Sequence, residues 1–247
     1  MNLVQSIMMN NPCYKAGRKI AVKGLMLHSV GCAQPSAKVF INTFNRSSYT
    51  AACVHAFIDA DTRTVYQTLP WNHRGWHGGS GKNGCCNNTH IGVEMCEPKE
   101  IKYTTGASFT VTDEAKARAA VQRTYAAAVE LFAYLCKLYG LDPMTDIISH
   151  KEGAAKGIAT AHSDPEHLWK GLCLPFTMDT FRKDVKLYMN GVVKIEEYTD
   201  IDSIAWDLNH RGIVTDKQGL IDAVKAEPNG RLYWLARKAL HYIRAHE

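Results

Sequence analysis

Several side chains in this sequence could together bind a metal ion. The stretch Ser149-His150-Lys151-Glu152-Gly153 is followed by Ala161-His162-Ser163-Asp164-Pro165, and far upstream His28 ends an apolar run. A catalytic zinc site takes three protein ligands, such as imidazole nitrogens and a carboxylate, and leaves a fourth position open. His28, His150 and Asp164 would supply such a set. Two imidazoles with one carboxylate favour zinc. A single histidine at a strand end is more often structural, so the prediction depends on the combination.

These ligands need elements that bring distant parts of the chain together. Residues 22–27 are predicted to form a buried strand that ends at His28, and residues 147–148 a strand that delivers His150. The pattern also predicts a helix over 35–46, a hairpin from the runs 53–59 and 64–69, a long loop over 71–88, a strand over 91–97, a helix from the N-cap Thr112 to Gly140, and a closing helix over 178–189. This order predicts an α/β fold with a central mixed β-sheet flanked by helices.

The last fifty residues differ in charge and pattern. Residues 1–194 carry 22 Lys and Arg against 15 Asp and Glu, whereas residues 195–247 carry 7 against 9. Apolar residues at helical spacing over 201–208, 220–224 and 232–243 predict three short helices. We therefore expect a catalytic domain over 1–192 and a small C-terminal helical module over 195–247. A bundle of roughly fifty residues is marginal alone, so we expect it to pack on the first domain or on a second copy.

Composition excludes several classes of protein. The net charge of +5 suits an anionic partner, but no basic run has interleaved aromatic residues, so nucleic acid is not expected. No apolar run approaches the roughly 18–20 residues of a membrane span, and no secretory signal is visible, which predicts a cytoplasmic product. The eight cysteines include no CxxC pair. Most are expected to be buried thiols, and a disulfide framework is the alternative.

Five short motifs follow one another in a characteristic order. They are Leu27-His28-Ser29, Gly75-Trp76-His77-Gly78-Gly79, Ile91-Gly92-Val93-Glu94, Ser149-His150 and His162-Ser163-Asp164-Pro165. In this order, over about residues 20–185, the chain resembles the zinc-dependent N-acetylmuramoyl-L-alanine amidases of type 2, which share their fold with peptidoglycan recognition proteins. The resemblance implies hydrolysis of the amide between N-acetylmuramic acid and L-alanine in bacterial peptidoglycan. It also implies a cell-wall-degrading endolysin of a phage or prophage, cytoplasmic until it is released at lysis.

The resemblance also assigns roles to individual residues. The family's ligands for one zinc ion fall on His28, His150 and Asp164, and its general base falls on Glu94. Where the family usually has a lysine that stabilises the oxyanion, this chain has His162, which departs from the pattern. An imidazole can still donate a hydrogen bond there, but only its protonated form adds a positive charge.

Other aromatic and imidazole side chains have competing interpretations. Trp76, His77 and His55 are candidates for lining the substrate groove, although a packed aromatic residue that anchors the loop would have the same sequence. His167 is close enough to Asp164 to be a rival metal ligand. The alternatives to an amidase are a non-catalytic peptidoglycan-binding module on the same fold and a zinc peptidase that cuts the stem peptide. The C-terminal module is expected to target the cell wall or to mediate homo-oligomerisation.

Overall fold

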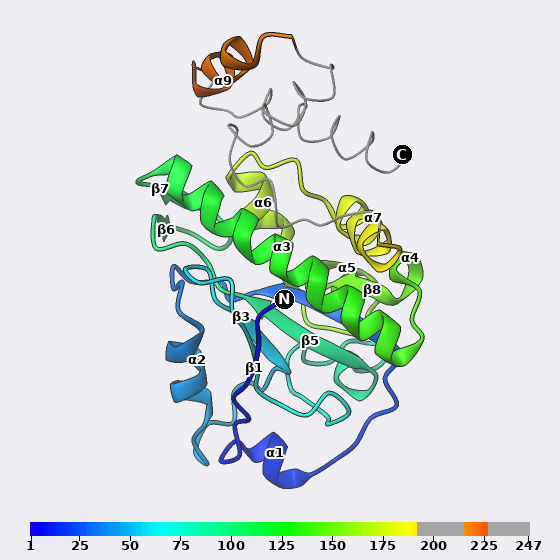
Figure 1. Ribbon diagram of the computed structural model, residues 1–247. Helices are drawn as coiled ribbons and strands as arrows, with labels where there is room; N and C mark the ends of the chain where they lie inside the picture. The colour runs from blue at the N-terminus through cyan, green and yellow to red at the C-terminus, as the bar shows by residue number, and fades with distance from the viewer. Residues whose placement is uncertain (192–214, 227–247) are drawn as a thin grey trace. The chain divides into compact units, whose positions relative to one another are not determined.

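The computed structural model describes residues 1–191 and 215–226, and the chain divides into two compact units, Met1–Val185 and Lys186–Glu247 (Figure 1). The α-helices and strands over residues 1–191 are, in chain order, β1 Leu3–Gln5, α1 Pro12–Ala16, β2 Gly24–Ser29, α2 Ala37–Phe44, β3 Ala56–Ile58, β4 Val65–Gln67, β5 His90–Met95, β6 Ile101–Tyr103, β7 Phe109–Val111, α3 Glu114–Tyr139, α4 Pro143–Asp146, β8 Ile147–Ser149, α5 His150–Ala155, α6 Glu166–Gly171 and α7 Met178–Met189. In the described parts of the chain, no helix is long and apolar enough to cross a membrane.

A six-stranded sheet with the order β1-β4-β3-β5-β2-β8 forms the centre of the first unit. Only β3 and β4 pair antiparallel, as the predicted hairpin, and the other neighbours are parallel. The expected mixed sheet is therefore confirmed. In the registers of β2 with β5 and of β2 with β8, His28 lies opposite Glu94 and Leu27 opposite Ser149. Parallel pairing thus brings three of the motifs to the same edge of the sheet.

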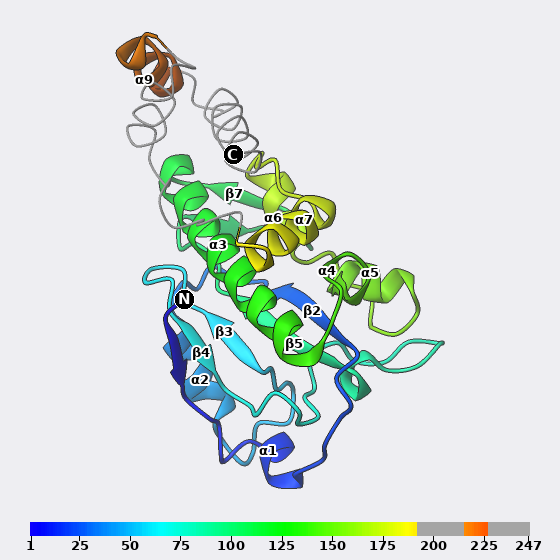
Figure 2. The ribbon, with the colours of Figure 1, turned by 45° about the vertical axis from the view of Figure 1, so that its right-hand side comes forward.

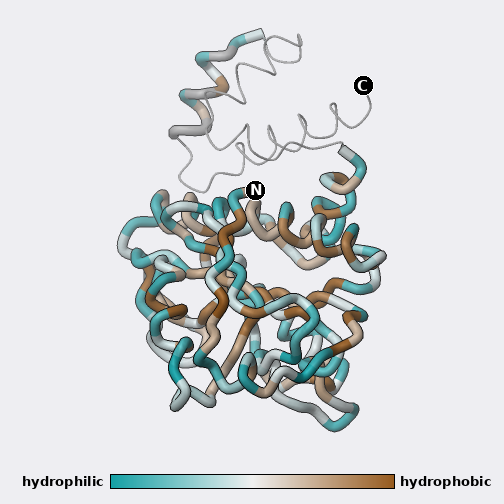
Figure 3. Tube along the Cα trace, turned by 60° about the horizontal axis from the view of Figure 1, so that its bottom comes forward, coloured by the Kyte–Doolittle hydropathy of each residue, from teal (hydrophilic) through white to brown (hydrophobic). Residues whose placement is uncertain are grey.

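Helix α3 lies across one face of this sheet (Figures 1 and 2). Its buried stripe includes Val121, Tyr125, Phe132 and Leu135, as the helical spacing predicts. The sequence analysis placed the N-cap at Thr112, whereas the structure places it at Asp113, whose side chain accepts a hydrogen bond from the backbone N–H of Lys116. An aspartate there also suits the positive end of the helix dipole. Figure 3 shows hydrophobic stretches running through the middle of this unit.

Several short elements were not expected from the sequence. They include β1, α1 and a separate two-stranded sheet in which β6 pairs antiparallel with β7. The stretch after Ser149, for which no element was predicted, begins helix α5. The eight cysteines have unpaired sulfurs. Fewer are buried than predicted, since only Cys53, Cys86, Cys96 and Cys136 are shielded from solvent.

The second unit is described over a short part of its length. Helix α9, Lys217–Ala226, matches the second of the three helices predicted for the tail. The helices predicted over 201–208 and 232–243 lie outside the described residues, and the division between domains near residue 194 stays a prediction.

Candidate metal centre and active site

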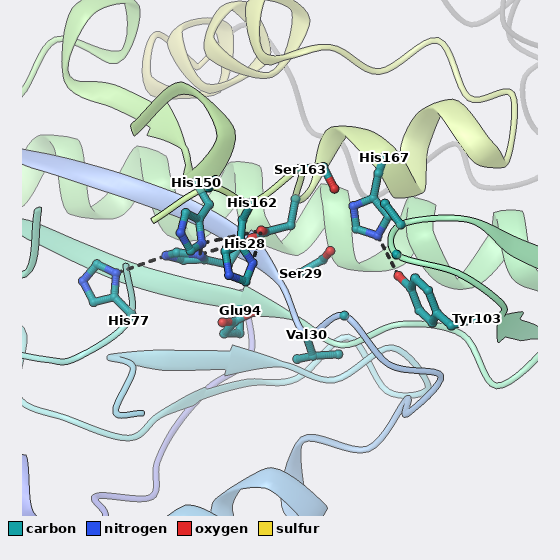
Figure 4. A pocket seen from close by; sticks show the side chains of 15 residues that line it. His28, Ser29, Val30, His77, Glu94, Tyr103, His150, His162, Ser163 and His167 are labelled. Carbon is teal, nitrogen blue, oxygen red and sulfur yellow. Dashed lines mark hydrogen bonds and ion pairs between the residues drawn. The ribbon is translucent and has the colours of Figure 1, made fainter. Parts of the chain in front are cut away.

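His28, His150 and Asp164 meet in the structure, although up to 136 positions separate them in the chain. The Nδ1 atoms of His28 and His150 are 3.1 Å apart, and His28 Nδ1 is 3.2 Å from Asp164 Oδ2. His150 Nδ1 lies 3.5 Å from Asp164 Oδ1. All three side chains are buried at the wall of one cavity of about 530 Å³ (Figure 4).

These separations suit a small tetrahedral ion. Metal–ligand distances of about 2.0–2.2 Å place tetrahedral ligand atoms about 3.3–3.6 Å apart, and the three observed separations are close to that value. Without a cation, these separations would bring two imidazole nitrogens and the carboxylate oxygens of Asp164 close together in a buried place, with no metal ion to bind them. The donor set and its spacing therefore fit zinc.

The protonation states of the ligands also suit a metal. Burial lowers the pKa of His28, which keeps the imidazole neutral. Burial by itself would raise the pKa of Asp164, but hydrogen bonds with His150 and His162 hold it well below its usual value. A metal binds neutral imidazole and ionised carboxylate, so little proton release is needed for either residue to bind.

A capping box holds His150 at the start of α5. The Ser149 side chain accepts a hydrogen bond from the backbone N–H of Glu152, and the Glu152 carboxylate accepts one from the backbone N–H of Ser149. The Ser149 hydroxyl also donates to Glu166 at 2.8 Å, and Arg182 of α7 donates to Glu152. This pattern of serine followed three residues later by glutamate is visible in the sequence, and it explains why a helix begins here.

A chain of two hydrogen bonds orients His28. His77 Nε2–H donates to the backbone carbonyl of His90 at 3.1 Å, so its Nδ1 carries a lone pair. That lone pair accepts from His28 Nε2–H, also at 3.1 Å, which leaves the lone pair of His28 Nδ1 directed at His150 and Asp164. Such outer partners commonly fix the tautomer of a metal-binding histidine. His77 lines the cavity as predicted, and its contacts show that it also supports a ligand.

Glu94 is the other carboxylate of the cavity wall. It lies opposite His28 in the strand register, and its Oε2 is buried without a hydrogen-bond partner among the residues that the structure describes. Burial, with a smaller contribution from Asp164 and Glu97, raises its pKa well above the usual value. A carboxylate with a raised pKa and a free oxygen beside a metal site is suited to accepting a proton from water.

His162 lies at the mouth of the same cavity. Its ring stacks on that of His150 with centroids 4.3 Å apart, and its Nδ1 is 3.5 Å from Asp164 Oδ1. The hydrogen bond with Asp164 raises the pKa of His162, whose side chain is 58% exposed. The imidazole can therefore present a proton, and with it a positive charge, close to the metal ligands.

A family model described as N-acetylmuramoyl-L-alanine amidase matches residues 17–167, more than half of the chain. The chain belongs to this amidase family. It is similar to two amidases of Bacillus subtilis (strain 168): CwlH, 49% identical over 48 residues, and XlyA, 51% identical over 54 residues. These matches cover 19% and 21% of this chain and 19% and 18% of the relatives, so the chain spans about a fifth of the curated relatives' length.

Solved structures agree on the fold of this amidase domain. The catalytic domain of XlyA, 22% identical, has a TM-score of 0.51 and covers 75% of this chain and 99% of its own. The PlyG catalytic domain, 16% identical, has a TM-score of 0.54 and covers 76% and 96%. At these identities the likeness establishes only the architecture, a mixed sheet flanked by helices. The candidate site is inferred from the distances between His28, His150 and Asp164.

Two residues predicted to line the groove lie elsewhere in the amidase domain. His55 is fully buried: its Nε2–H donates to the His73 carbonyl, its Nδ1 accepts from the Gly92 N–H, and burial lowers its pKa to about 4. His55 therefore has a structural role and does not line the cavity. Trp76 is 36% exposed outside this cavity, with the Arg74 guanidinium 5.4 Å from its ring.

The amidase cavity also contains residues that the sequence analysis missed. Tyr103, Gly106 and Ala107 come from the β6–β7 hairpin, and Ser29 and Gly31 follow His28. The signal for the hairpin was two short runs of strand-forming residues on either side of Thr104–Ser108, but each strand has only three residues. His167, the rival ligand, lies outside the ligand group and contacts the Tyr103 hydroxyl at 2.6 Å.

Proposed function

We propose that this chain hydrolyses the amide bond between N-acetylmuramic acid and L-alanine in bacterial peptidoglycan, with one zinc ion held by His28, His150 and Asp164. The observation that carries the proposal is the buried set of these three ligands in one cavity with Glu94. Membership of the amidase family supports the choice of bond. A non-catalytic binding module would have no need of a complete ligand set with a carboxylate base beside it.

Each residue of the site has a part in the proposed reaction. Zinc bound by the three ligands supplies a Lewis acid, which acidifies water and polarises a carbonyl group. Glu94 accepts the proton of the attacking water at its free Oε2 and then donates it to the departing amine of L-alanine. His162 donates a hydrogen bond to the oxygen of the tetrahedral intermediate. His77 holds the tautomer of His28 that faces the metal site.

Mass spectrometry of digested peptidoglycan tests the bond that is cut. The proposal expects new free N-terminal L-alanine on the stem peptide and an intact glycan chain. Cleavage within the stem peptide would make the chain a peptidase, and binding without cleavage would make it a recognition module. Glu94→Gln should lower turnover by about 10²–10⁴-fold, the usual contribution of a general base. The exposed Tyr134→Phe on α3 is the matched control and should keep wild-type turnover.

The biological setting follows from the same proposal. We propose an endolysin of a phage or prophage that stays in the cytoplasm until lysis and then acts on the cell wall. Its domains would be an amidase over residues 1–192 and a helical module over 195–247 that binds the wall or a second copy. A solved structure titled as a mutant endolysin from Bacillus subtilis shares the fold and supports this assignment.

A further inference from the structure

One end of the cavity is built by residues that the proposed chemistry does not use. Tyr103 of the β6–β7 hairpin and His167 of α6 lie at this end (Figure 4), and Gly106 and Ala107 of the same hairpin also line the cavity. His28, His150, His162 and Glu94, which the proposed reaction uses, lie together in another part of the cavity (Figure 4). The hairpin end therefore has room and polar groups for another part of the substrate.

The hairpin is fixed to the helix that carries His167. The rings of Tyr103 and Phe109, on the two strands of the hairpin, pack edge to face with centroids 5.6 Å apart. The last residue of α6 is Gly171, and a side chain there would collide with the Phe109 ring. This close approach holds Tyr103 and His167 in a fixed relation, as a binding site requires.

Three side chains form a continuous line of hydrogen bonds at this end. One oxygen of Glu97 accepts from the backbone N–H of Gly31 at 3.0 Å, and the other accepts from the Tyr103 hydroxyl at 2.8 Å. The same hydroxyl oxygen lies 2.6 Å from His167 Nε2. A hydroxyl has only one proton to donate. Burial raises the pKa of Glu97 to about 7, so above this pH Glu97 is ionised and Tyr103 donates to it. The Tyr103–His167 bond then uses the proton of His167 Nε2.

This line determines what His167 can offer to a ligand. Because Nε2 carries the proton, Nδ1 of the neutral ring carries a lone pair. Burial lowers the pKa of His167, which favours the neutral ring. Nδ1 is itself buried, and no residue in the described parts of the chain hydrogen-bonds to it. A buried acceptor without a partner is costly, and a ligand N–H would remove that cost.

We infer that His167 accepts a hydrogen bond from a peptide N–H of the stem peptide, one or two residues beyond the bond that is cut, and that Tyr103 and Glu97 position it. The inference rests on the proposed function. His167 is the second residue of α6 and follows Asp164 by three positions in the chain, and both side chains line the same cavity. An extended peptide advances about 3.3–3.6 Å per residue, so its next amides pass this place.

Kinetics on two probes test this contact in the full chain. N-acetylmuramoyl-L-alanine has no peptide N–H beyond the amide that is cut, whereas an N-acetylmuramoyl tripeptide has two. Glutamine at position 167 can replace Nε2 but not Nδ1, and asparagine the reverse. We expect His167→Gln to lower kcat/KM for the tripeptide relative to the short probe by about three- to tenfold, mainly through KM. His167→Asn should keep more of the preference for the tripeptide.

Tyr103→Phe tests the positioning role with a matched control. Loss of the hydroxyl frees the tautomer of His167, so the preference for the tripeptide should fall and the nitrogen NMR shifts of His167 should change. Tyr134→Phe, on the exposed surface of α3, should leave both unchanged. An equal loss on both probes in His167→Gln, or an unchanged preference, overturns the inference while cleavage by the wild type upholds the proposed function. A wild type that cleaves neither probe refutes both.

Discussion

Zinc added to the metal-free chain should raise its melting temperature by an amount that follows from binding linkage. A ligand that binds only the folded state at 100 times its Kd stabilises that state by about 2.7 kcal/mol. For a domain of 150–250 residues, each kcal/mol shifts the melting temperature by about 2–4 °C. The first unit, Met1–Val185, is of this size. We therefore expect zinc at 100 times Kd to raise its melting temperature by about 5–11 °C, measured by calorimetry after dialysis against a chelator.

Two carboxylate variants separate metal binding from proton transfer. Asp164→Asn removes the charge that lies 3.2 Å from His28 and 3.5 Å from His150. If the affinity falls about 100-fold, as it can even when an outer partner of a ligand is lost, the same zinc concentration equals the new Kd. The stabilisation then drops to about 0.4 kcal/mol, a shift of about 1–2 °C. Glu94→Gln should keep the full shift, since Glu94 lies outside the ligand group.

The opposite pattern would refute the assignment of these roles. A full zinc-induced shift in Asp164→Asn would mean that the metal binds elsewhere or without this carboxylate. Loss of the shift in Glu94→Gln would make Glu94 a ligand and leave the reaction without its proposed base. A control titration with magnesium should give a much smaller shift, because magnesium prefers an all-oxygen octahedral site.

Three further measurements test groups around the site. Burial raises the pKa of Glu97 to about 7 from 4.5, so the folded state binds the proton more tightly than the unfolded state does. The free energy of unfolding of the wild type should therefore fall by up to about 3 kcal/mol as the pH rises from 4.5 to 7. In urea titrations Glu97→Gln should lack this fall. Activity that needs protonated His162 should decline as the pH rises through its raised pKa. In pH–rate profiles, His162→Lys should extend activity to higher pH, and an unchanged rate in His162→Ala would remove His162 from the mechanism. A chain ending after Lys194 should sediment less with cell walls while still cutting soluble substrate, and equal sedimentation would rule out targeting.

Two of the proposed metal ligands, His28 and His150, were predictable because each lies at the end of a recognisable strand. The apolar runs before His28 and before His150 indicate buried strands, and parallel strands bring their carboxyl ends to one edge. The helix that His150 begins was also encoded locally, by Ser149 and Glu152, although it was missed. The β6–β7 hairpin was harder to predict, because three-residue strands carry almost no periodicity.

The error at His55 has a different cause. An imidazole in an apolar strand gives no local sign of its partners, and the two groups that satisfy His55 are the carbonyl of His73 and the N–H of Gly92. Both partners are distant in sequence: Gly92 meets His55 because β5 pairs with β3, and His73 lies in the loop over 71–88. Sequence spacing alone could not distinguish a histidine that faces the substrate from one that the backbone fully satisfies.

The packing of His77 also explains why the motif Gly75–Gly79 lies against the motif Ile91–Glu94. A Cβ at Gly92 would collide with the imidazole of His77, so the absence of a side chain at Gly92 leaves room for the His77 ring against β5. From there His77 accepts a hydrogen bond from His28 Nε2–H, and the opposite nitrogen of His28 faces His150 and Asp164. Residues alternate between the faces of a strand, so Glu94, two positions after Gly92, lies on the same face. One strand therefore carries both Gly92, which makes room for His77, and Glu94, the proposed general base.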